Sequence, residues 1–402
     1  MNYKTEEQHK KQWSEKSKLP EITIVMPCLN EAKTLRDCIA EAQFAIDRMG
    51  IPGEIIVADN GSTDDSTAIA NAAGARVVFV KERGYGAALS AGIKAAHAPF
   101  VVYGDCDGSY DFRQSYRLLK KLQQGADLAV GTRFPAGGGN IMPGAMPWLH
   151  RYFGTPALTA ILRNLYRIPI TDMNSGLRGI RVKTFNALRM ASTGMEFNSE
   201  IVLQLKQHGY RITEAPITLR KDRRDRPPHL RTWHDGWRQL CILLIFSPSV
   251  LFLWPGFLLA LLGTALLTSL IPGIMTIGPV NLSTNSRIVA SLIALSGTQT
   301  LLLGLFAKYL AITQRMILSE LHFEVWFRYF NRFAMPIGLC LILVGSYFVI
   351  DVFISWQRVG FGYFASEGAD RILVPAATLI VFGFQLISAA FFAMLLDFSL
   401  RK

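Results

Sequence analysis

Two carboxylates separated by one residue follow an apolar run of the chain. Asp105 and Asp107 flank Cys106 directly after PFVVYG (Pro99–Gly104). Because residues i and i+2 of an extended chain point the same way, both carboxylates can face one cation. Mg²⁺ and Mn²⁺ prefer hard oxygen ligands and commonly use one or two carboxylates plus substrate phosphates. Chance placement in a loop explains most D-x-D sequences, but the position after an apolar run favours a metal site here.

The segment DNGSTDDS (Asp59–Ser66) also follows an apolar run, and it opens a helix-like stretch. A tight turn with an N-cap from Ser62 or Thr63 explains part of this composition. Asp59 could also accept hydrogen bonds from a base or a ribose at the strand end. The two interpretations are compatible because capping positions the loop.

A glycine-containing segment, RGYGAA (Arg83–Ala88), lies between another strand-like run and another helix-like stretch. Glycine lets the backbone approach a ligand closely, and a helix N-terminus favours phosphate. The pattern is not the G-x-G-x-x-G of dinucleotide sites, and Gly92 does not complete it. A plain turn explains the segment equally well.

Several arginines could bind a phosphate group. Arg133, in GTRF (Gly131–Phe134), ends a further strand-like run on the same expected edge as the D-x-D. Its guanidinium could hold a phosphate through two parallel hydrogen bonds. Arg151 and the basic stretch from Arg220 to Arg238 are further candidates, although a solvated charged face explains such a stretch as well.

Strand-like runs alternate with helix-like stretches around these residues. Five runs look like buried strands: Ile22–Pro27, Glu54–Asp59, Arg76–Val80, Pro99–Gly104 and Asp127–Thr132. Helix-like stretches lie between them, near 31–48, 63–73, 86–97 and 112–124. This alternation predicts an α/β, Rossmann-like domain with a mostly parallel sheet covered on both faces. Ligands of such sheets bind beyond the carboxyl ends of the strands, where the candidate residues are expected.

The rest of the chain is much more apolar. The whole sequence is 50% hydrophobic and 18% charged, with a mean hydropathy of +0.25, which favours a soluble half joined to a membrane half. Four apolar runs, at about 249–271, 288–312, 334–355 and 372–396, are each long enough to cross a hydrocarbon core of about 30 Å. We therefore predict a polar N-terminal arm (1–20), a catalytic domain (21–240), a basic or interfacial juxtamembrane segment (220–248) and a membrane domain (249–402) with four transmembrane helices.

Charge predicts the orientation and the partners. The net charge of +12 divides as +9 before Cys241 (33 Lys/Arg against 24 Asp/Glu) and +3 from Cys241 onward (9 against 6). An anionic partner is expected, and the membrane segments favour a phosphorylated substrate or a lipid surface over nucleic acid. The loop after the second span carries Lys308, Arg315, Arg328 and Arg332. With four spans, this predicts a multi-pass protein of the cell (inner) membrane whose termini and catalytic domain are cytoplasmic.

The five cysteines show no paired spacing, so we expect free thiols in a reducing cytoplasm. The charged N-terminus leads into only six apolar-rich residues, Ile22–Pro27. A signal peptide needs a longer apolar core, and none is predicted.

Taken in order, these motifs resemble those of GT-A type glycosyltransferases of family 2, especially the polyprenyl-phosphate (dolichol-phosphate) mannose and glucose synthases. The resemblance covers roughly residues 22–245. It rests on ITIVMPCLNEAKTL, EIIVADNGSTDDS, RGYGAAL, DCDGSYD, GTRF, DMNSGLRGIR and GMEFNSEIV. It implies a GT-A fold and inversion at the anomeric carbon. The membrane part is similar only in having a few spans after the catalytic domain.

The resemblance implies a role for each matching position. Asp105 and Asp107 would serve the donor diphosphate and hold Mg²⁺ or Mn²⁺, with Arg133 completing the catalytic set. The implied donor-binding residues are Pro27, Asn30, Glu31, Asp59, Gly84 and Gly86. The implied acceptor-phosphate residues are Arg133, Arg151 and Arg178. The segment around Asp172 and Arg178, with Glu200 beyond it, would shape the acceptor side.

Three departures from the family pattern matter. Asn60 stands where many members have a second aspartate, and Ser109 stands in place of a glutamine that can assist at the metal in mannose synthases. The third metal ligand and the mannose assignment therefore stay open. The Q-x-x-R-W sequence typical of processive synthases is absent from the sequence, which favours transfer of a single sugar.

The resulting hypothesis is transfer of one sugar from a UDP- or GDP-linked donor to a polyprenyl phosphate. A phosphate monoester has a second pKa of about 6 and is already largely dianionic at neutral pH, so it needs cations rather than a general base. One alternative is transfer to a lipid alcohol such as a diacylglycerol or ceramide, with Asp172 or Asp111 as base. Another is a non-catalytic lipid-linked sugar translocator or scaffold. The sugar, the nucleotide, the polyprenol and the pathway stay open, as does a homo-oligomeric state.

Overall fold

The computed structural model describes residues 19–223, 232–314, 316–318, 320–361 and 369–400. It consists of two compact units that divide between Leu243 and Leu244. Most of the expected polar arm and the stretch 224–231 of the basic segment lie outside the described residues, as do Arg315 and the two C-terminal residues.

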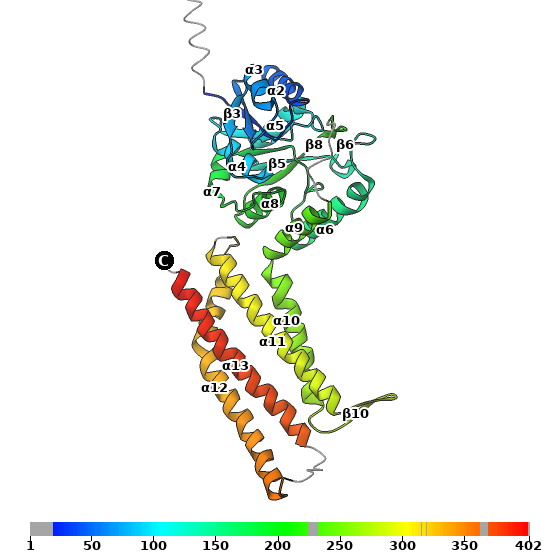
Figure 1. Ribbon diagram of the computed structural model, residues 1–402, viewed down its shortest axis with the longest axis vertical. Helices are drawn as coiled ribbons and strands as arrows, with labels where there is room; N and C mark the ends of the chain where they lie inside the picture. Colours follow the sequence, from blue (N-terminus) through cyan, green and yellow to red (C-terminus); the bar gives the residue numbers. More distant parts are fainter. Residues whose placement is uncertain (1–18, 224–231, 315, 319, 362–368, 401–402) are drawn as a thin grey trace, which may run out of the picture. The chain divides into compact units, whose positions relative to one another are not determined.

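The first unit is built on a seven-stranded sheet with the strand order β3-β2-β1-β4-β7-β5-β8 (Figure 1). Its strands are β1 (Ile22–Cys28), β2 (Gly53–Asp59), β3 (Arg76–Phe79), β4 (Phe100–Tyr103), β5 (Leu128–Thr132), β7 (Arg178–Arg181) and β8 (Ile212–Pro216). Short strands β6 (Asn140–Ile141) and β9 (Thr218–Leu219) form a separate parallel pair. The helices are α2 (Leu35–Met49), α3 (Ser66–Ala72), α4 (Tyr85–Lys94), α5 (Ser115–Gln123), α6 (Thr155–Tyr166), α7 (Val182–Ala187), α8 (Phe197–Gln207) and α9 (Thr232–Ile245), with single turns η1 (Phe112–Gln114), η2 (Pro135–Gly137) and η3 (His150–Gly154).

The predicted mostly parallel sheet is confirmed, with one exception. β7 pairs antiparallel with both β4 and β5, whereas the remaining neighbours in the sheet are parallel. Tyr103 at the end of β4 and Val130 in β5 both pair with Arg178 at the start of β7. The loop that leads into β7 therefore lies at the edge where β4 and β5 have their carboxyl ends.

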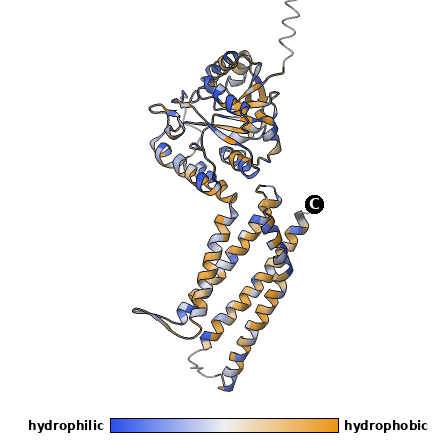
Figure 2. Ribbon diagram, turned by 180° about the vertical axis from the view of Figure 1, so that it is seen from behind, coloured by the Kyte–Doolittle hydropathy of each residue, from blue (hydrophilic) through white to orange (hydrophobic). Residues whose placement is uncertain are grey.

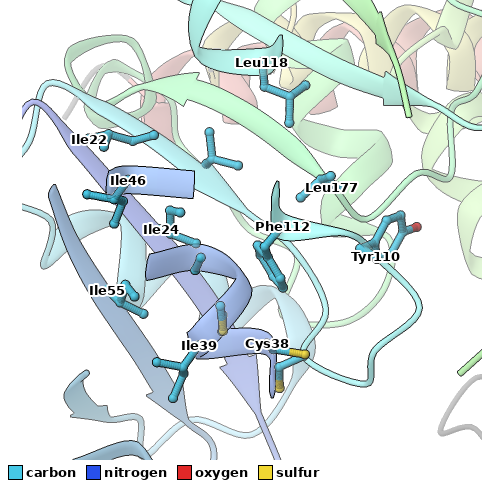
Figure 3. Packing of buried hydrophobic residues seen from close by; sticks show 14 of the residues in the cluster. Ile22, Ile24, Cys38, Ile39, Ile46, Ile55, Tyr110, Phe112, Leu118 and Leu177 are labelled. Carbon is cyan, nitrogen blue, oxygen red and sulfur yellow. The ribbon is translucent and has the colours of Figure 1, made fainter. Parts of the chain in front are cut away.

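Helix α2 illustrates why the helices cover this sheet. Its buried residues include Leu35, Cys38, Ile39, Ala42 and Ile46, a spacing that places them on one face of a helix. Figure 3 shows this face packed against Ile22, Ile24 and Ile55 of the sheet, with Phe112 and Leu177 in the same cluster. Full burial of one such aliphatic side chain stabilises the fold by roughly 1.5–3 kcal/mol. The sheet is therefore a rigid support for the loops at its edge.

The second unit consists mainly of long apolar helices, as their hydropathy colouring shows (Figure 2). Its elements are η4 (Ser249–Leu253), α10 (Trp254–Ser269), the hairpin strands β10 (Met275–Ile277) and β11 (Val280–Leu282), α11 (Thr284–Thr313), α12 (Leu321–Arg358) and α13 (Ala369–Leu400). Four segments of the described chain are long and apolar enough to cross a membrane: Ser249–Ser269, Thr284–Thr313, Leu321–Arg358 and Ala369–Phe398. The four predicted spans are confirmed as helices, and the last three extend beyond the predicted bounds at both ends.

Small residues let these helices approach closely. A Cβ atom at Gly263 of α10 would lie 2.2 Å from the backbone nitrogen of Ala294 in α11. A Cβ atom at Gly338 of α12 would likewise lie 2.7 Å from the carbonyl oxygen of Gly383 in α13. The helices therefore pack as two close pairs, α10 with α11 and α12 with α13.

Candidate active site

A cavity of about 360 Å³ lies where β1, β2 and β4 end. Polar side chains and loop backbone from widely separated parts of the first unit line it: Pro27, Cys28, Leu29, Glu31, Asn60, Arg83, Gly84, Tyr85, Ala88, Asp105, Cys106, Asp107, Gly194, Met195, Asp235 and Arg238. Sequence reasoning had singled out Pro27, Glu31, Gly84, Asp105 and Asp107 of these. The position agrees with the rule that ligands bind beyond the carboxyl ends of parallel strands.

The loop after β2 is held in place by its own polar side chains. The Asp59 carboxylate accepts hydrogen bonds from the backbone N–H groups of Gly61 (3.1 Å) and Ser62 (3.2 Å). The amide oxygen of Asn30 accepts one from the N–H of Thr63 (2.7 Å), which joins this loop to the loop after β1. Asp59 and Asn30 thus shape the wall of the cavity without belonging to the lining residues, and direct donor contact stays a prediction for both.

Gly84 and Gly86 pack against the segment that precedes α8. A Cβ atom at Gly84, which has a φ of +138°, would lie 2.1 Å from the carbonyl oxygen of Thr193. Any larger residue would therefore be strained and would collide with backbone. The N–H of Gly84 donates to the amide oxygen of Asn60 (2.7 Å), and the N–H of Gly86 donates to the carbonyl of Thr193 (2.8 Å). Gly84 lines the cavity and Gly86 fixes the loop behind it.

Glu200 fixes the same segment from its other side. Its carboxylate accepts hydrogen bonds from the N–H groups of Ala191 (2.9 Å) and Ser192 (2.7 Å) and from the side chain of Gln204 (2.8 Å). Glu200 is 2% exposed. Its role in this structure is to position the cavity wall at Gly194 and Met195.

Asp105 and Asp107 both line the cavity, directly after β4. Oδ1 of Asp107 accepts hydrogen bonds from the backbone N–H (2.9 Å) and the hydroxyl (2.5 Å) of Ser109. Asp105 packs against Gly176, where a Cβ atom would lie 2.6 Å from its Oδ2. The hydroxyl of Thr34 donates to the carbonyl of Cys106 between them (2.7 Å).

The carboxylates of Asp105 and Asp107 fit a magnesium or manganese ion whose remaining coordination sites are filled by a substrate. The described residues contain no group of three or more His, Cys, Asp or Glu side chains that could hold a metal by themselves. Two carboxylates in one cavity match the other common arrangement, in which substrate phosphates supply further oxygen ligands. Ser109 steadies Asp107 in this structure, at the position where family members can carry a glutamine.

Arg133 forms an ion pair with Asp172, a carboxylate from the loop that precedes β7. Its Nε and Nη2 donate to the two carboxylate oxygens of Asp172 at 2.6 and 2.8 Å, and its Nη1 donates to the hydroxyl of Tyr110 at 3.4 Å. Burial lowers the pKa of Arg133, but the nearby carboxylate of Asp172 outweighs this and raises the pKa above its usual range. The guanidinium is therefore permanently charged, and Asp172 orients it. The residue as a whole is 7% exposed.

Arg178 and Arg151 differ in exposure. Arg178 is fully buried, and its guanidinium donates to the backbone carbonyls of Ser175 (2.8 Å), Asn198 (2.6 Å) and Met173. It therefore holds together the loop that leads into β7 and the start of α8. Arg151 lies in η3 with its guanidinium 5.6 Å from the ring centre of Tyr152. The cavity lining formed by described residues includes neither of them, nor Arg133, so phosphate contact stays a prediction for all three.

Some lining residues were not singled out individually from the sequence, although Arg238 belongs to the basic stretch that was a phosphate-binding candidate. Arg83 and Tyr85 belong to RGYGAA, and Gly194 and Met195 begin GMEFNSEIV, so these motifs already contained the signal. Asp235 and Arg238 come from α9, at the end of the basic stretch. They could not be separated from its other charges, because only folding brings one face of α9 to the cavity.

The fold and the ordered motifs define a glycosyltransferase, and comparison with known proteins identifies its family. A family described as Glycosyl transferase family 2 matches residues 23–189, and the Glycosyltransferase family 2 C-terminal transmembrane region matches residues 305–397. The chain is 32% identical over 375 residues to the low-salt glycan biosynthesis hexosyltransferase Agl6 of Haloferax volcanii, covering 92% of this chain and 88% of Agl6. The chain belongs to glycosyltransferase family 2 and is a membrane protein with a GT-A catalytic domain.

Two further relatives match the catalytic part. The dolichyl-phosphate hexose transferase of Haloferax volcanii is 29% identical over 202 residues, covering 50% of this chain and 83% of the relative. The polyprenol monophosphomannose synthase of Mycolicibacterium smegmatis is 28% identical over 210 residues, covering 49% and 76%.

Proposed function

We propose that this glycosyltransferase moves one sugar from a UDP- or GDP-linked donor to a polyprenyl phosphate, with inversion at the anomeric carbon. The observation that carries the proposal is the cavity at the strand ends, which combines Asp105 and Asp107 with Arg83 and Arg238. Two carboxylates suit a divalent ion, and two guanidinium groups suit phosphates. The names of two relatives, which refer to dolichyl phosphate and to polyprenol, support a lipid phosphate as the acceptor class.

In the proposed reaction, the bond between the anomeric carbon and the donor diphosphate breaks. A bond forms between the same carbon and an oxygen of the acceptor phosphate, and the nucleoside diphosphate leaves. Asp105 and Asp107 would hold Mg²⁺ or Mn²⁺, which when bound supplies positive charge for the departing diphosphate. The loops fixed by Asp59, Gly84 and Glu200 keep the two reactants in place and limit the entropy lost at the transition state.

A lipid alcohol is the less favoured acceptor on structural grounds. An alcohol needs a general base, and the candidates were Asp111 and Asp172. Asp172 is fully buried in its ion pair with Arg133. Asp111 forms ion pairs with Arg113 and Arg220. Burial raises the pKa of its carboxyl, but hydrogen bonds from these two arginines outweigh burial and lower the pKa to about 2. A carboxylate with so low a pKa is a weak base.

The membrane unit fits an acceptor that stays in the bilayer. Four spanning helices would return the chain to the side on which it entered. Arg328 and Arg332 lie in the first part of α12, a helix of 38 residues that is longer than a membrane crossing needs, and basic residues at the end of a span favour the cytoplasm for that side. A nucleotide-sugar is a cytoplasmic metabolite, so the same orientation would give the site access to both substrates. We place the enzyme in the cell membrane with its catalytic unit cytoplasmic.

The decisive experiment uses the full chain in membranes. Purified membranes would be incubated with Mn²⁺, radiolabelled UDP- or GDP-sugars and a polyprenyl phosphate, and lipids would be extracted and separated. We expect one labelled glycolipid whose sugar is released by mild acid, as a glycosyl phosphate is. Label on the matching free polyprenol or on diacylglycerol, with none on the phosphate, would refute the acceptor assignment.

A further inference from the structure

Two arginines line the cavity among the residues that the structure describes, and they come from different parts of the chain, the loop before α4 and helix α9. Arg83 precedes Gly84, and its Nη2 lies 3.8 Å from the Cβ position of Gly61, beside the loop after β2. Arg238 comes from α9, far along the chain, and lies with Asp235 on the cavity-facing side of that helix. Arg83 therefore lies beside the loop after β2, whereas Arg238 is held by the segment before α8.

Arg238 is oriented by a buried carboxylate. Its Nη2 forms an ion pair with Oε1 of Glu196 in the segment before α8. The side chain of Glu196 is 6% exposed and that of Arg238 is 46% exposed, so the pair reaches from the protein interior to the open cavity. A guanidinium has five N–H donors in a rigid fork, and the contact with Glu196 engages only one of its nitrogen atoms. The remaining donors suit a second anion.

The position of Arg238 in the chain indicates which anion this is. Helix α9 ends at Ile245, and the first spanning segment begins at Ser249, so Arg238 belongs to the last helix before the membrane part of the chain. A lipid acceptor keeps its tail in the bilayer, and among the described residues that line the cavity, those of α9 are the nearest to the first spanning segment along the chain. In the proposed reaction, Arg83, Asp105 and Asp107 are the cavity residues that would serve the donor diphosphate.

We propose that Arg238, held by Glu196, binds the phosphate of the lipid acceptor in this cavity. This rests on the proposed function, and it assigns the acceptor contact to a residue outside the three arginines that the family resemblance implied. In this arrangement Arg133 and Arg178 position the loop before β7, and Arg238 meets the substrate. Glu196 is a positioning residue that acts through Arg238.

The test measures each substrate separately on the full chain in detergent. Arg238→Gln, Arg238→Lys and Glu196→Gln would be compared with the wild type, using a short-chain, detergent-soluble polyprenyl phosphate as the acceptor. A hydrogen bond to a charged group contributes enough that its loss should weaken acceptor binding on the order of 10- to 100-fold in Arg238→Gln. Arg238→Lys, which keeps the charge but loses the fork, should show a smaller loss.

Nucleotide binding shows whether Arg238 contacts the acceptor phosphate or the donor diphosphate. Binding of UDP and GDP in the presence of Mn²⁺, measured by calorimetry, should be unchanged in Arg238→Gln. The inference is overturned if the acceptor KM and acceptor affinity stay at the wild-type values, and also if nucleotide binding weakens instead. Glu196→Gln should raise the acceptor KM with little change in kcat, and it should add nothing to Arg238→Gln; an additive loss would remove Glu196 from this role.

A matched control is Arg211→Gln. Arg211 is an exposed arginine just before β8, at the opposite edge of the sheet. Its substitution should leave the affinities for the acceptor and for the nucleotide unchanged. Direct binding of the polyprenyl phosphate separates the two proposals. If the wild type binds polyprenyl phosphate through Arg238 but shows no turnover, the proposed function is refuted and the role of Arg238 stands. If the enzyme turns over polyprenyl phosphate but Arg238→Gln has the wild-type acceptor KM, the role of Arg238 is refuted and the proposed function stands.

Discussion

Arg133 and Asp172 form a buried, two-pronged ion pair, with Nε and Nη2 of the arginine at 2.6 and 2.8 Å from the two carboxylate oxygens. The backbone N–H of Arg133 also donates to Asp172, at 3.1 Å. The end of β5 is thereby fastened to the loop that precedes β7. An arginine predicted to hold a substrate thus has a protein partner that fixes its direction.

Removing one partner of this pair should destabilise the first unit. A buried charge left without its partner costs about 3–5 kcal/mol. We expect Asp172→Ala to lower the melting temperature of the purified chain substantially and to raise the acceptor KM. The control is Asp47→Asn, an exposed carboxylate on α2, which should stay within about 0.5 kcal/mol of the wild type. Equal melting temperatures for Asp172→Ala and the control would contradict the importance of the pair.

Gly176→Ala should disturb the carboxylates that we propose bind the metal, without unfolding the chain. The added Cβ atom would lie 2.6 Å from Oδ2 of Asp105 and 3.1 Å from the ring of Tyr110, so one of them must shift. A displacement of about 1 Å in an active site can cost on the order of 100-fold in rate. We expect a large fall in kcat with little change in melting temperature. Gly154→Ala, whose Cβ atom would make only ordinary contacts of 3.7 Å and longer, is the control; similar kcat values for the two variants would exclude this explanation.

Asp107→Asn should weaken binding of the divalent ion. The substitution keeps the size of a side chain that is 4% exposed, so membrane insertion should persist. Mn²⁺ binding, followed by electron paramagnetic resonance, should weaken by about 10-fold or more, and turnover should fall with it. Asp65→Asn, at an exposed position before α3, should leave both unchanged. Full Mn²⁺ affinity in Asp107→Asn would remove this residue from the metal site.

Asp111 should contribute a pH-dependent part of the stability. Although burial raises the pKa of its carboxyl, hydrogen bonds from Arg113 and Arg220 outweigh this and lower it to about 2. A carboxyl with a lowered folded-state pKa stabilises the fold above its unfolded value of about 3.9, and the contribution is lost as the pH falls to about 2. We therefore expect the difference in melting temperature between the wild type and Arg220→Gln to shrink over this window. A difference that stays constant, as expected for Arg36→Gln on the exposed face of α2, would refute the assignment.

Strands β1 to β5 could be predicted from the sequence because each is an apolar run bounded by residues that favour turns. Observed strands β1 to β5 begin and end within one residue of the predicted runs. β7 was missed because its sequence, Arg-Gly-Ile-Arg, has no strand periodicity of its own. It becomes a strand because β4 and β5 offer hydrogen bonds on both sides, which is a tertiary effect.

The contacts that orient the arginines of the site could not be predicted from the sequence, because they too depend on tertiary structure. Asp172 was expected on the acceptor side, but its pairing with Arg133 joins residues 39 positions apart. Glu196 and Arg238 are 42 positions apart and belong to different motifs. Sequence order predicts which residues follow strand ends, whereas the partner of each arginine depends on how the later loops fold back.

The reversed direction of β7 has a consequence for altering this enzyme. Because β7 starts at the edge where β4 and β5 end, its preceding loop reaches Asp105 through Gly176 and Arg133 through Asp172. One short stretch of backbone thus contacts both Asp105, which we propose binds the metal, and Arg133, which the family resemblance assigns to the acceptor. We therefore expect substitutions between 172 and 177 that are made to change acceptor selectivity to alter turnover of the donor as well.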